Sequence, residues 1–446
     1  MKENKPPNNL FLNRKVYIAG MIAVIVLFAL FFSLMSDSLK VYLGTGQKQE
    51  ADATTEISLT FAFQNPQWNA QIEQTVAAFE QEYPQIRVTY EPDYEHVVYE
   101  DVLARRIARN ELGDIVQLKT PEAYVEGDYL APIPDKVSKD VSYAYQSDGK
   151  IWAVGAVETT SGILYNKKIF EQYQLEEPAT YDDFLNICSI LRTNGIVPIG
   201  VAGDDLWHME YWVNHYFRTD ILSENGDWLN EAAAGLVSWT DAEIISMLAE
   251  MKGLFENQYV NADWRSVRDT ALNYMLTSGN VAMVYTGPWT AAGVQATDGF
   301  EAGWFLVPDR EGRTFAARNQ DTYWALSKEC AKDEETYQAA ICFLEFFYSQ
   351  ENYSRICENT LTFPVKEIAS GTGAQDGIRA DIMESDQNST KKVIDYIGNS
   401  SCPQNFEADM LEIIEAYLDS DESAESAAEK IQAAWEDRVE MEKTDG

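Results

Sequence analysis

Residues suited to metal binding and disulfide formation are scarce in this 446-residue chain, which has three histidines and five cysteines. The histidines, His96, His208 and His215, lack the HExxH spacing of a zinc protease, so we expect no metal site. The cysteines form no CxxC pair, which argues against a zinc ribbon and a disulfide framework. We expect most of them to be buried free thiols, and one disulfide remains open.

Motifs of the common enzyme classes are also missing. The chain has no P-loop, no GxSxG elbow and no dinucleotide fingerprint, and we expect no cofactor. A glycosidase needs two carboxylates at a set separation. The 72 acidic residues leave that alternative open, but no motif points to it, so the chain is not expected to be an enzyme.

Basic residues are few, with 34 Lys and Arg against 72 Asp and Glu, and the net charge is −38. This negative charge repels nucleic acid, and the sequence has no basic patch with interleaved aromatic residues that would offset the repulsion. Apolar residues make up 46% and aromatic residues 12% of the chain, which is too much for a disordered protein. We therefore expect folded domains with the acidic residues on their surface. The length exceeds what one hydrophobic core normally serves, which predicts two lobes.

One long apolar run is present, at residues 16–35, and it contains no charge. Its length of about 20 residues suits a membrane-spanning helix. Four cations precede it, so the positive-inside rule places residues 1–15 in the cytoplasm and everything after the helix outside the cell. No cysteine precedes Cys188, which excludes a lipoprotein signal, and the small residues at 51–53 lie too far downstream for a cleavage site. We expect an uncleaved, single-pass anchor followed by a tether at residues 36–56.

Strands and helices alternate through the first part of the ectodomain. Period-two strands are predicted at 57–63, 86–90 and 114–118, and helices lie between them, one with Ile72, Val76 and Phe79 on one stripe. This order predicts a largely parallel α/β sheet whose ligands bind at the carboxyl ends of the strands. Residues 64–68 and 117–120 are therefore placed to face a cleft.

The stretch from 148 to 184 is predicted to form two strands followed by two helices. Asp148 and Gly149 form a turn, Asn166 is a predicted helix N-cap, and Thr180 with Asp183 makes a capping-box start. The two strands, 151–157 and 162–165, are suited to cross from one lobe to another.

Four ordered segments carry a resemblance to a known family. They read DGKIWAV–GILYNKKIFEQY–PATYDDF–NGIVPI from 148, FEQEYPQIRVTYE from 79, LNYMLTSGNVAMVYTGPW from 272, and ALSKECAKDEETYQAAICFLEFFYSQE from 325. As a set they resemble the extracellular solute-binding proteins of ABC importers, in the carbohydrate-binding group that includes maltose-binding protein.

The resemblance implies an α/β, type II periplasmic-binding-protein-like fold with two lobes and hinge strands. We expect residues 57–157 and 303–350 in lobe 1, and residues 158–302 and 351–446 in lobe 2. A sugar or oligosaccharide would be held between the lobes and delivered to ABC permease subunits. The missing lipobox cysteine departs from the family pattern and favours the helical anchor instead.

Sugar recognition needs aromatic faces and planar polar side chains. By analogy with the family, Glu158 would accept from sugar hydroxyls, Trp289 would stack on a ring, and Asp205 with Trp207 would form an acidic–aromatic pair. Further candidates near predicted strand ends are Asn65, Trp68, Asn319 and Asp321. Each of these has an ordinary structural alternative, as core packing for the tryptophans or as a turn for the polar residues.

A second functional class stays open, because a helical anchor also suits a binding protein that reports ligand occupancy to a membrane partner such as a histidine kinase. Neighbouring permease genes would favour import, and a neighbouring kinase gene would favour sensing. The particular sugar is not predicted.

Overall fold

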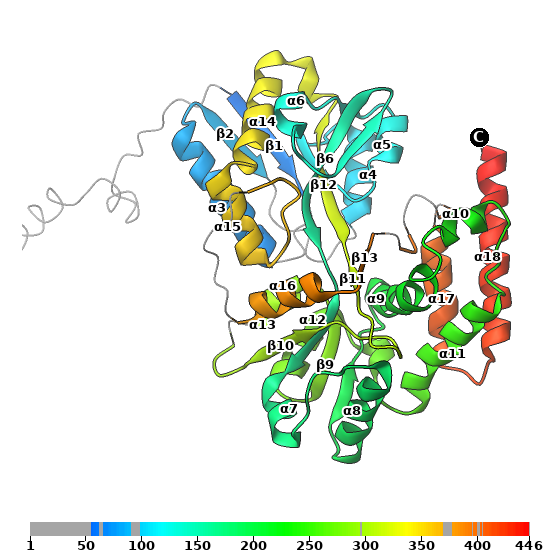
Figure 1. The fold of residues 1–446 in the computed structure, drawn as a ribbon. Coiled ribbons are helices and arrows are strands. Elements are labelled where there is room, and N and C mark those ends of the chain that lie inside the picture. Colours follow the sequence, from blue (N-terminus) through cyan, green and yellow to red (C-terminus); the bar gives the residue numbers. More distant parts are fainter. Residues whose placement is uncertain are drawn as a thin grey trace, which may run out of the picture. The chain divides into compact units, whose positions relative to one another are not determined.

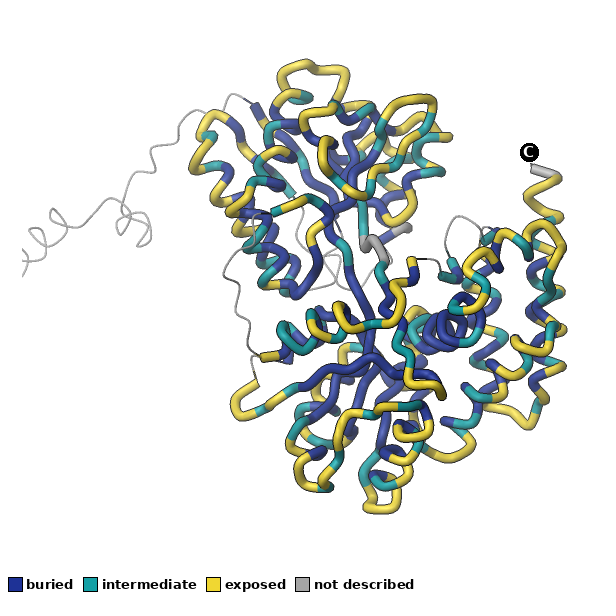
Figure 2. Tube along the Cα trace, in the orientation of Figure 1, coloured by how far each residue is buried: buried dark blue, intermediate teal, exposed yellow. Residues whose placement is uncertain are grey.

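The computed structural model describes residues 55–61, 66–90, 99–294, 297–368, 377–394, 396–398, 402–403 and 405–445. Three hydrophobic clusters form in this part of the chain, one around the sheet of lobe 1 and two around the four-stranded sheet of lobe 2. Figure 1 shows the two lobes joined by β6 (Lys150–Thr159) and β12 (Asn319–Ser327), and Figure 2 shows buried residues concentrated inside each lobe.

Lobe 1 is built on a sheet with the order β2-β1-β3-β12-β6-β5, to which β4 adds by pairing with β12. The first three strands are parallel, whereas β12 runs antiparallel to both β3 and β6. The remaining strands are β1 (Thr55–Thr60), β2 (Ile86–Tyr90), β3 (Ile115–Leu118), β4 (Leu130–Ala131) and β5 (Ala144–Ser147). Its helices are α3 (Pro66–Glu82), α4 (Tyr99–Arg109), α5 (Glu122–Glu126), α6 (Asp135–Ser138), η3 (Cys330–Lys332), α14 (Glu334–Phe347) and α15 (Gln350–Thr360).

Lobe 2 contains a sheet with the order β10-β7-β9-β8 and a small parallel pair, β11 with β13. These strands are β7 (Gly162–Asn166), β8 (Val197–Gly200), β9 (Val281–Thr286), β10 (Ala302–Phe305), β11 (Phe315–Ala317) and β13 (Lys391–Val393). The first half of its helices is α7 (Lys167–Tyr173), α8 (Tyr181–Thr193), α9 (Leu206–Tyr216), the π-helix η1 (Phe217–Leu222), α10 (Trp228–Ala233) and α11 (Ala242–Glu256). The second half is η2 (Trp264–Ser266), α12 (Asp269–Thr277), α13 (Pro288–Val294), α16 (Ile378–Asn388), α17 (Phe406–Leu418) and α18 (Ala424–Asp445).

Within the described residues, three segments run between the lobes. The chain leaves lobe 1 after β6, returns between β11 and β12, and touches lobe 2 again around Leu361 and Phe363 before Val365 rejoins the core of lobe 1. Glu158 of β6 and Phe363 exchange backbone hydrogen bonds of 2.9 and 2.8 Å. The crossing segments are therefore bonded to one another where they leave lobe 1.

The lobe boundaries differ from those expected. Strand β10 pairs with β7, so residues 303–317 belong to lobe 2, because the chain returns to lobe 1 only at Arg318. Tyr353 and Ile356 of α15 are buried in the core of lobe 1, where α15 packs on α3. Lobe 1 therefore extends beyond the expected residue 350.

The apolar segment at 16–35 and the tether at 36–56 lie outside the described residues, apart from the first residues of β1. Within the described ranges, no helix has both the length and the apolar character needed to cross a bilayer.

Local chemistry accounts for the start of the second lobe. The Asn166 side chain accepts from the backbone N–H groups of Lys168 and Ile169 and begins α7. Thr180 and Asp183 form a reciprocal capping box at the start of α8.

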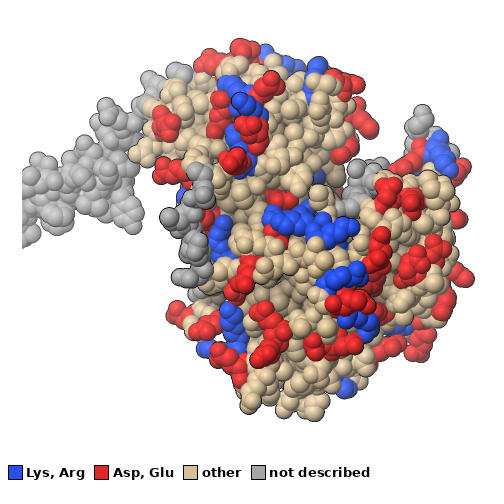
Figure 3. Space-filling model, viewed as in Figure 1, with Lys and Arg blue, Asp and Glu red and all other residues tan. Residues whose placement is uncertain are grey.

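All five cysteines are free thiols, three of them buried. Acidic side chains are spread over the face seen in Figure 3, as the net charge leads one to expect.

Candidate functional site

Arg318 lies between β11 and β12, where the chain passes from lobe 2 back to lobe 1. Its guanidinium donates to Glu158 on β6 and makes two parallel bonds of 2.7 Å to Asp386 on α16. The guanidinium carbon also lies 3.5 Å from the centre of the Phe363 ring. The side chains of Arg318, Glu158 and Asp386 are only 12, 13 and 4% exposed, so these charges are mostly removed from water.

Two further groups complete this arrangement. The Tyr143 hydroxyl donates to the other oxygen of Glu158 at 2.7 Å, and Lys392 donates to Asp386 at 2.9 Å. Burial alone would raise the pKa of Asp386, but the hydrogen bonds from Arg318 and Lys392 outweigh it and hold the pKa below its ordinary value. We call Tyr143, Glu158, Arg318, Asp386 and Lys392 the hinge network, since it links the crossing segments to both lobes.

An aromatic surface forms where α9 and α13 begin. Tyr211 lies with its ring centre 6.0 Å from Trp207 and 6.0 Å from Trp289. Trp207 is 44% exposed, and the other two are half-buried. We call Trp207, Tyr211 and Trp289 the aromatic surface; rings held this way can pack against the C–H faces of a sugar.

Close backbone packing positions the Trp289 ring. A Cβ atom at Gly287 would lie 2.1 Å from this ring, so glycine is needed directly before Pro288. At the other end, the Asp205 carboxylate precedes α9 and accepts from the backbone N–H of Asp269 at 2.7 Å. That bond ties the start of α9, and with it Trp207, to the start of α12.

Charged groups from both lobes come within electrostatic range of one another at Glu210, the residue before Tyr211 on α9. Burial, and after it the nearby Glu407 carboxylate, raise the pKa of Glu210 on α9, whereas the charge of Lys119 from lobe 1 lowers it. Glu407 begins α17, and Lys119 follows β3. Two carboxyls of lobe 2 therefore lie within electrostatic range of a cation of lobe 1.

The other side of the aromatic surface also borders lobe 1, because α13 packs against α3. A Cβ atom at Gly293 would be 3.5 Å from the Gln67 amide nitrogen. We call the aromatic surface together with Glu210, Glu407 and Lys119 the candidate interlobe site.

The residues predicted from the sequence fall into three groups. Trp207 and Trp289 are brought together through Tyr211, and Asp205 orients the helix that carries Trp207. Glu158 lies in the hinge network with both of its oxygens bonded to protein groups, a place that favours a structural role over contact with ligand. Trp68 is 9% exposed and stacks on Trp324 in the core of lobe 1, with ring centres 6.4 Å apart.

The remaining predicted residues are less defined. Asn65 lies outside the described residues. Asn319 and Asp321 lie in β12 directly after Arg318, at the crossing into lobe 1, and their ligand contacts stay predictions.

Sequence reasoning missed Tyr211, Glu210 and Glu407 as site residues. Tyr211 follows Trp207 by four residues on one helix, and residues with this spacing lie on the same helix face. The spacing could therefore have indicated that the two rings lie side by side. Lys119 lies in the segment 117–120 that was expected to face a cleft. Nothing local links Glu210 to Glu407, which is 197 positions away in the chain.

The fold and this site define a two-lobed binding protein, and comparison with known proteins gives its family. The family model described as bacterial extracellular solute-binding protein matches residues 64–353, more than half of the chain. The chain belongs to this family, which confirms the resemblance drawn from its motifs. The family consists of binding proteins, and the chain is a binding protein rather than an enzyme.

Two curated relatives illustrate the similarity. The multiple sugar-binding protein of Streptococcus mutans is 20% identical over 291 residues, covering 61% of this chain and 67% of its own length. The melibiose/raffinose/stachyose-binding protein MelE of Bacillus subtilis is 22% identical over 221 residues, or 47% of this chain, and the match spans about half (51%) of that relative.

Solved structures share the fold. A chitin oligosaccharide binding protein superposes with a TM-score of 0.75 at 18% identity, covering 87% of this chain and 100% of that one. The solute-binding protein RafE in complex with raffinose gives a TM-score of 0.69 at 18% identity, covering 86 and 99%. Both confirm the α/β two-lobe architecture.

Proposed function

We propose that this protein captures a sugar or oligosaccharide between its two lobes and delivers it to an ABC permease outside the cell. The observation that carries the proposal is the aromatic surface of Trp207, Tyr211 and Trp289, set beside carboxyls of lobe 2 and Lys119 of lobe 1. Aromatic rings suit the apolar face of a pyranose, and carboxylates accept from its hydroxyls. Relatives named for binding raffinose, stachyose and chitin oligosaccharides support the same class of ligand.

The mechanism follows from contact with both lobes. A ligand that touches α9 and α13 of lobe 2 as well as lobe 1 binds the closed arrangement better than the open one, and so shifts the population toward it. The three crossing segments are where such a rotation would occur, and the hinge network holds them together. A closed form differs in surface from an open one, which lets a permease distinguish loaded from empty protein.

The ligand class is tested by measuring the melting temperature of the ectodomain with raffinose, stachyose or chitin oligosaccharides added. A ligand that binds only the folded state raises the melting temperature. Trp289→Ala should weaken binding of the stabilising sugar by tenfold or more, which is about 1.4 kcal/mol. The matched control is Tyr274→Ala on α12, because Tyr274 is 71% exposed and has no contact with the aromatic surface among the described residues. Stabilisation by amino acids or peptides but by no saccharide would contradict the ligand class, and unchanged affinity in Trp289→Ala would remove that ring from the site.

We also propose that residues 1–15 are cytoplasmic, 16–35 span the membrane, and 36–56 tether the binding domain, because the apolar run and its preceding cations have the required length and asymmetry. The full chain should remain in the membrane fraction after a high-salt wash, and deletion of 16–35 should release it. Recovery of the intact chain in the soluble fraction would contradict the anchor.

A further inference from the structure

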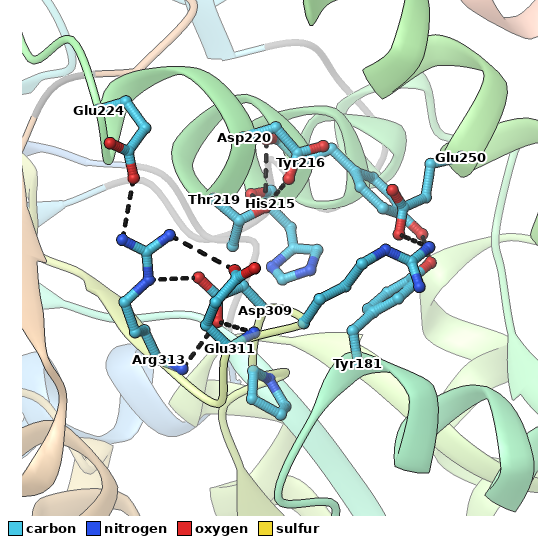
Figure 4. A pocket seen from close by; sticks show the side chains of 12 residues that line it. Tyr181, His215, Tyr216, Thr219, Asp220, Glu224, Glu250, Asp309, Glu311 and Arg313 are labelled. Atoms are coloured by element: carbon cyan, nitrogen blue, oxygen red, sulfur yellow. Dashed lines mark hydrogen bonds and ion pairs between the residues drawn. The ribbon is translucent and has the colours of Figure 1, made fainter.

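Lobe 2 contains a cavity of about 180 Å³ that lies apart from the aromatic surface and the hinge network. It opens to solvent and is lined by the end of α9, the π-helix η1, the start of α8, α11 and the loop at 308–313. Its volume is below the roughly 300–1,000 Å³ of pockets for drug-sized ligands, so it suits a molecule of a few heavy atoms. Figure 4 shows its side chains converging from these elements.

Carboxylates outnumber cations in the lining of this cavity. The carboxylates are Asp220, Glu224, Glu250, Asp309 and Glu311, and the cations are Arg310 and Arg313. Both arginines are already engaged, Arg313 with Asp309 and Glu224 at 2.7 and 2.9 Å, and Arg310 with Glu250 at 2.9 Å.

Asp220 is the carboxylate left without an ion pair. Among the described residues its one hydrogen-bond donor is the hydroxyl of its neighbour Thr219, at 3.0 Å. Burial, and after it the Glu250 carboxylate, raise the pKa of Asp220 to about 7. An added cation therefore stabilises the unpaired Asp220 carboxylate more than it stabilises a carboxylate that already has an ion-pair partner.

His215 supplies an independent sign of a ligand. The residue is 3% exposed, its ring points into the cavity, and neither ring nitrogen has a hydrogen-bond partner in the described part of the chain. Burial, followed by the charge of Arg218, lowers the pKa of His215 to about 3, so the ring is neutral and has one nitrogen that can accept. The free acceptor of His215 faces the open cavity, where a ligand that donates a hydrogen bond can reach it.

The rest of the wall suits an organic cation better than a metal ion. Tyr181 and Tyr216 bond to each other through their hydroxyls at 2.7 Å, and the Tyr181 ring already holds the Arg310 guanidinium 5.2 Å from its centre. No set of three or more His, Cys, Asp or Glu side chains in the described ranges has the geometry to hold a metal.

We propose that this cavity is a second binding site, which takes a small aliphatic ammonium ion with Asp220 as its charge partner and His215 as a hydrogen-bond acceptor. The ammonium group donates to the Asp220 carboxylate and to the lone pair of the imidazole, and its alkyl chain lies against the Tyr181 and Tyr216 rings. The site is separate from the candidate interlobe site and does not depend on sugar being the transported solute.

Isothermal titration of the full chain in detergent with 1,4-diaminobutane tests the proposal, with 1,4-butanediol as the uncharged analogue. We expect one saturable site for the diamine and none for the diol at pH 8. Asp220→Asn should weaken diamine binding at least tenfold, whereas the control Glu243→Gln should bind as the parent does, because Glu243 is exposed on α11 and does not line the cavity. His215→Phe should also weaken binding, since the ring volume is kept but the acceptor is lost.

The proposal is overturned by an absence of saturable heat with diaminobutane, by equal binding of the diamine to the parent and to Asp220→Asn, or by stronger stabilisation by Ca²⁺ or Mg²⁺ than by the diamine. If Asp220→Asn does not fold, the parent protein still decides the matter. Diamine affinity should fall severalfold from pH 8 to pH 5.5 as Asp220, whose pKa is raised to about 7, becomes protonated. Affinity that is the same at both pH values would exclude the carboxylate as charge partner.

Discussion

The hinge network and the cavity of lobe 2 both bury carboxyl groups, but they give those groups opposite proton affinities. Asp386 is bonded by Arg318 and Lys392, and its pKa lies below the ordinary value. Asp220 has no such partner, and its pKa is raised. The difference teaches that burial by itself favours the protonated acid, and that only built-in cations make a buried carboxylate a stable part of the fold. Among the described residues, Asp220 has no bonded cation from the protein, so its carboxylate is left available to a positively charged ligand.

Removing the central cation of the hinge network should have the largest effect. Arg318→Met leaves Glu158 and Asp386 buried without their shared partner, and breaking such a pair costs about 3–5 kcal/mol. Urea unfolding of the ectodomain at pH 7 measures this loss. The matched control is Arg268→Met, because the ion pair of Arg268 with Asp204 is exposed and screened by water, so its loss should change stability little. An equal loss in the two variants would mean that the hinge network is not energetically distinct.

Asp386→Asn should cost less, about 1–3 kcal/mol at pH 7, since Arg318 keeps Glu158. The pKa of Asp386 is lower in the folded state than its ordinary 3.8, so its contribution is complete above pH 4 and is lost as the pH falls through the folded value. Thermal unfolding from pH 7 to pH 3 should therefore show the parent and the variant converging at the acid end. A stability difference that stays constant over this range would contradict the assigned ionisation.

Asp220→Asn should act in the opposite direction and stabilise the empty protein at pH 8, because the parent must keep an unpaired carboxylate buried. A folded pKa of about 7 against an ordinary 3.8 means that the parent is most favoured below pH 4 and loses stability as the pH rises through 7. The gain should accordingly vanish near pH 4, as measured by thermal unfolding. Destabilisation at pH 8 would show that Asp220 has a structural partner after all.

The smallest change is expected for Lys392→Met. The Lys392 side chain is 50% exposed, and Asp386 keeps its two bonds to Arg318, so the loss should be about 0.5 kcal/mol or less. A loss approaching that of Arg318→Met would mean that both cations are needed to hold the Asp386 carboxylate.

Local features of this fold were predictable because they depend on a few adjacent residues. The N-cap at Asn166 and the capping box of Thr180 with Asp183 are formed as their spacing predicts. The helix from 272 and the strand beginning at Val281 are also present, as α12 and β9. The family motifs then led correctly to the two-lobe fold.

The partners of the site residues were not predictable in the same way. Glu158 meets an arginine 160 positions later, and that arginine meets Asp386 a further 68 positions on. Trp68 lies next to a predicted strand end, yet its ring stacks on Trp324 because β12 inserts between β3 and β6. Such neighbours follow from sheet order, which one sequence does not specify.

The position of β12 also bears on how the chain is made. Residues 319–327 occupy the gap between β3 and β6 in the sheet of lobe 1, so about 160 residues of lobe 2 must leave the ribosome before that sheet can be completed. Until then β3 and β6 lack the strand that separates them, and nascent lobe 1 presents unpaired edges to which chaperones or other chains can bind. Late pairing of β12 is thus the step that completes the sheet of lobe 1.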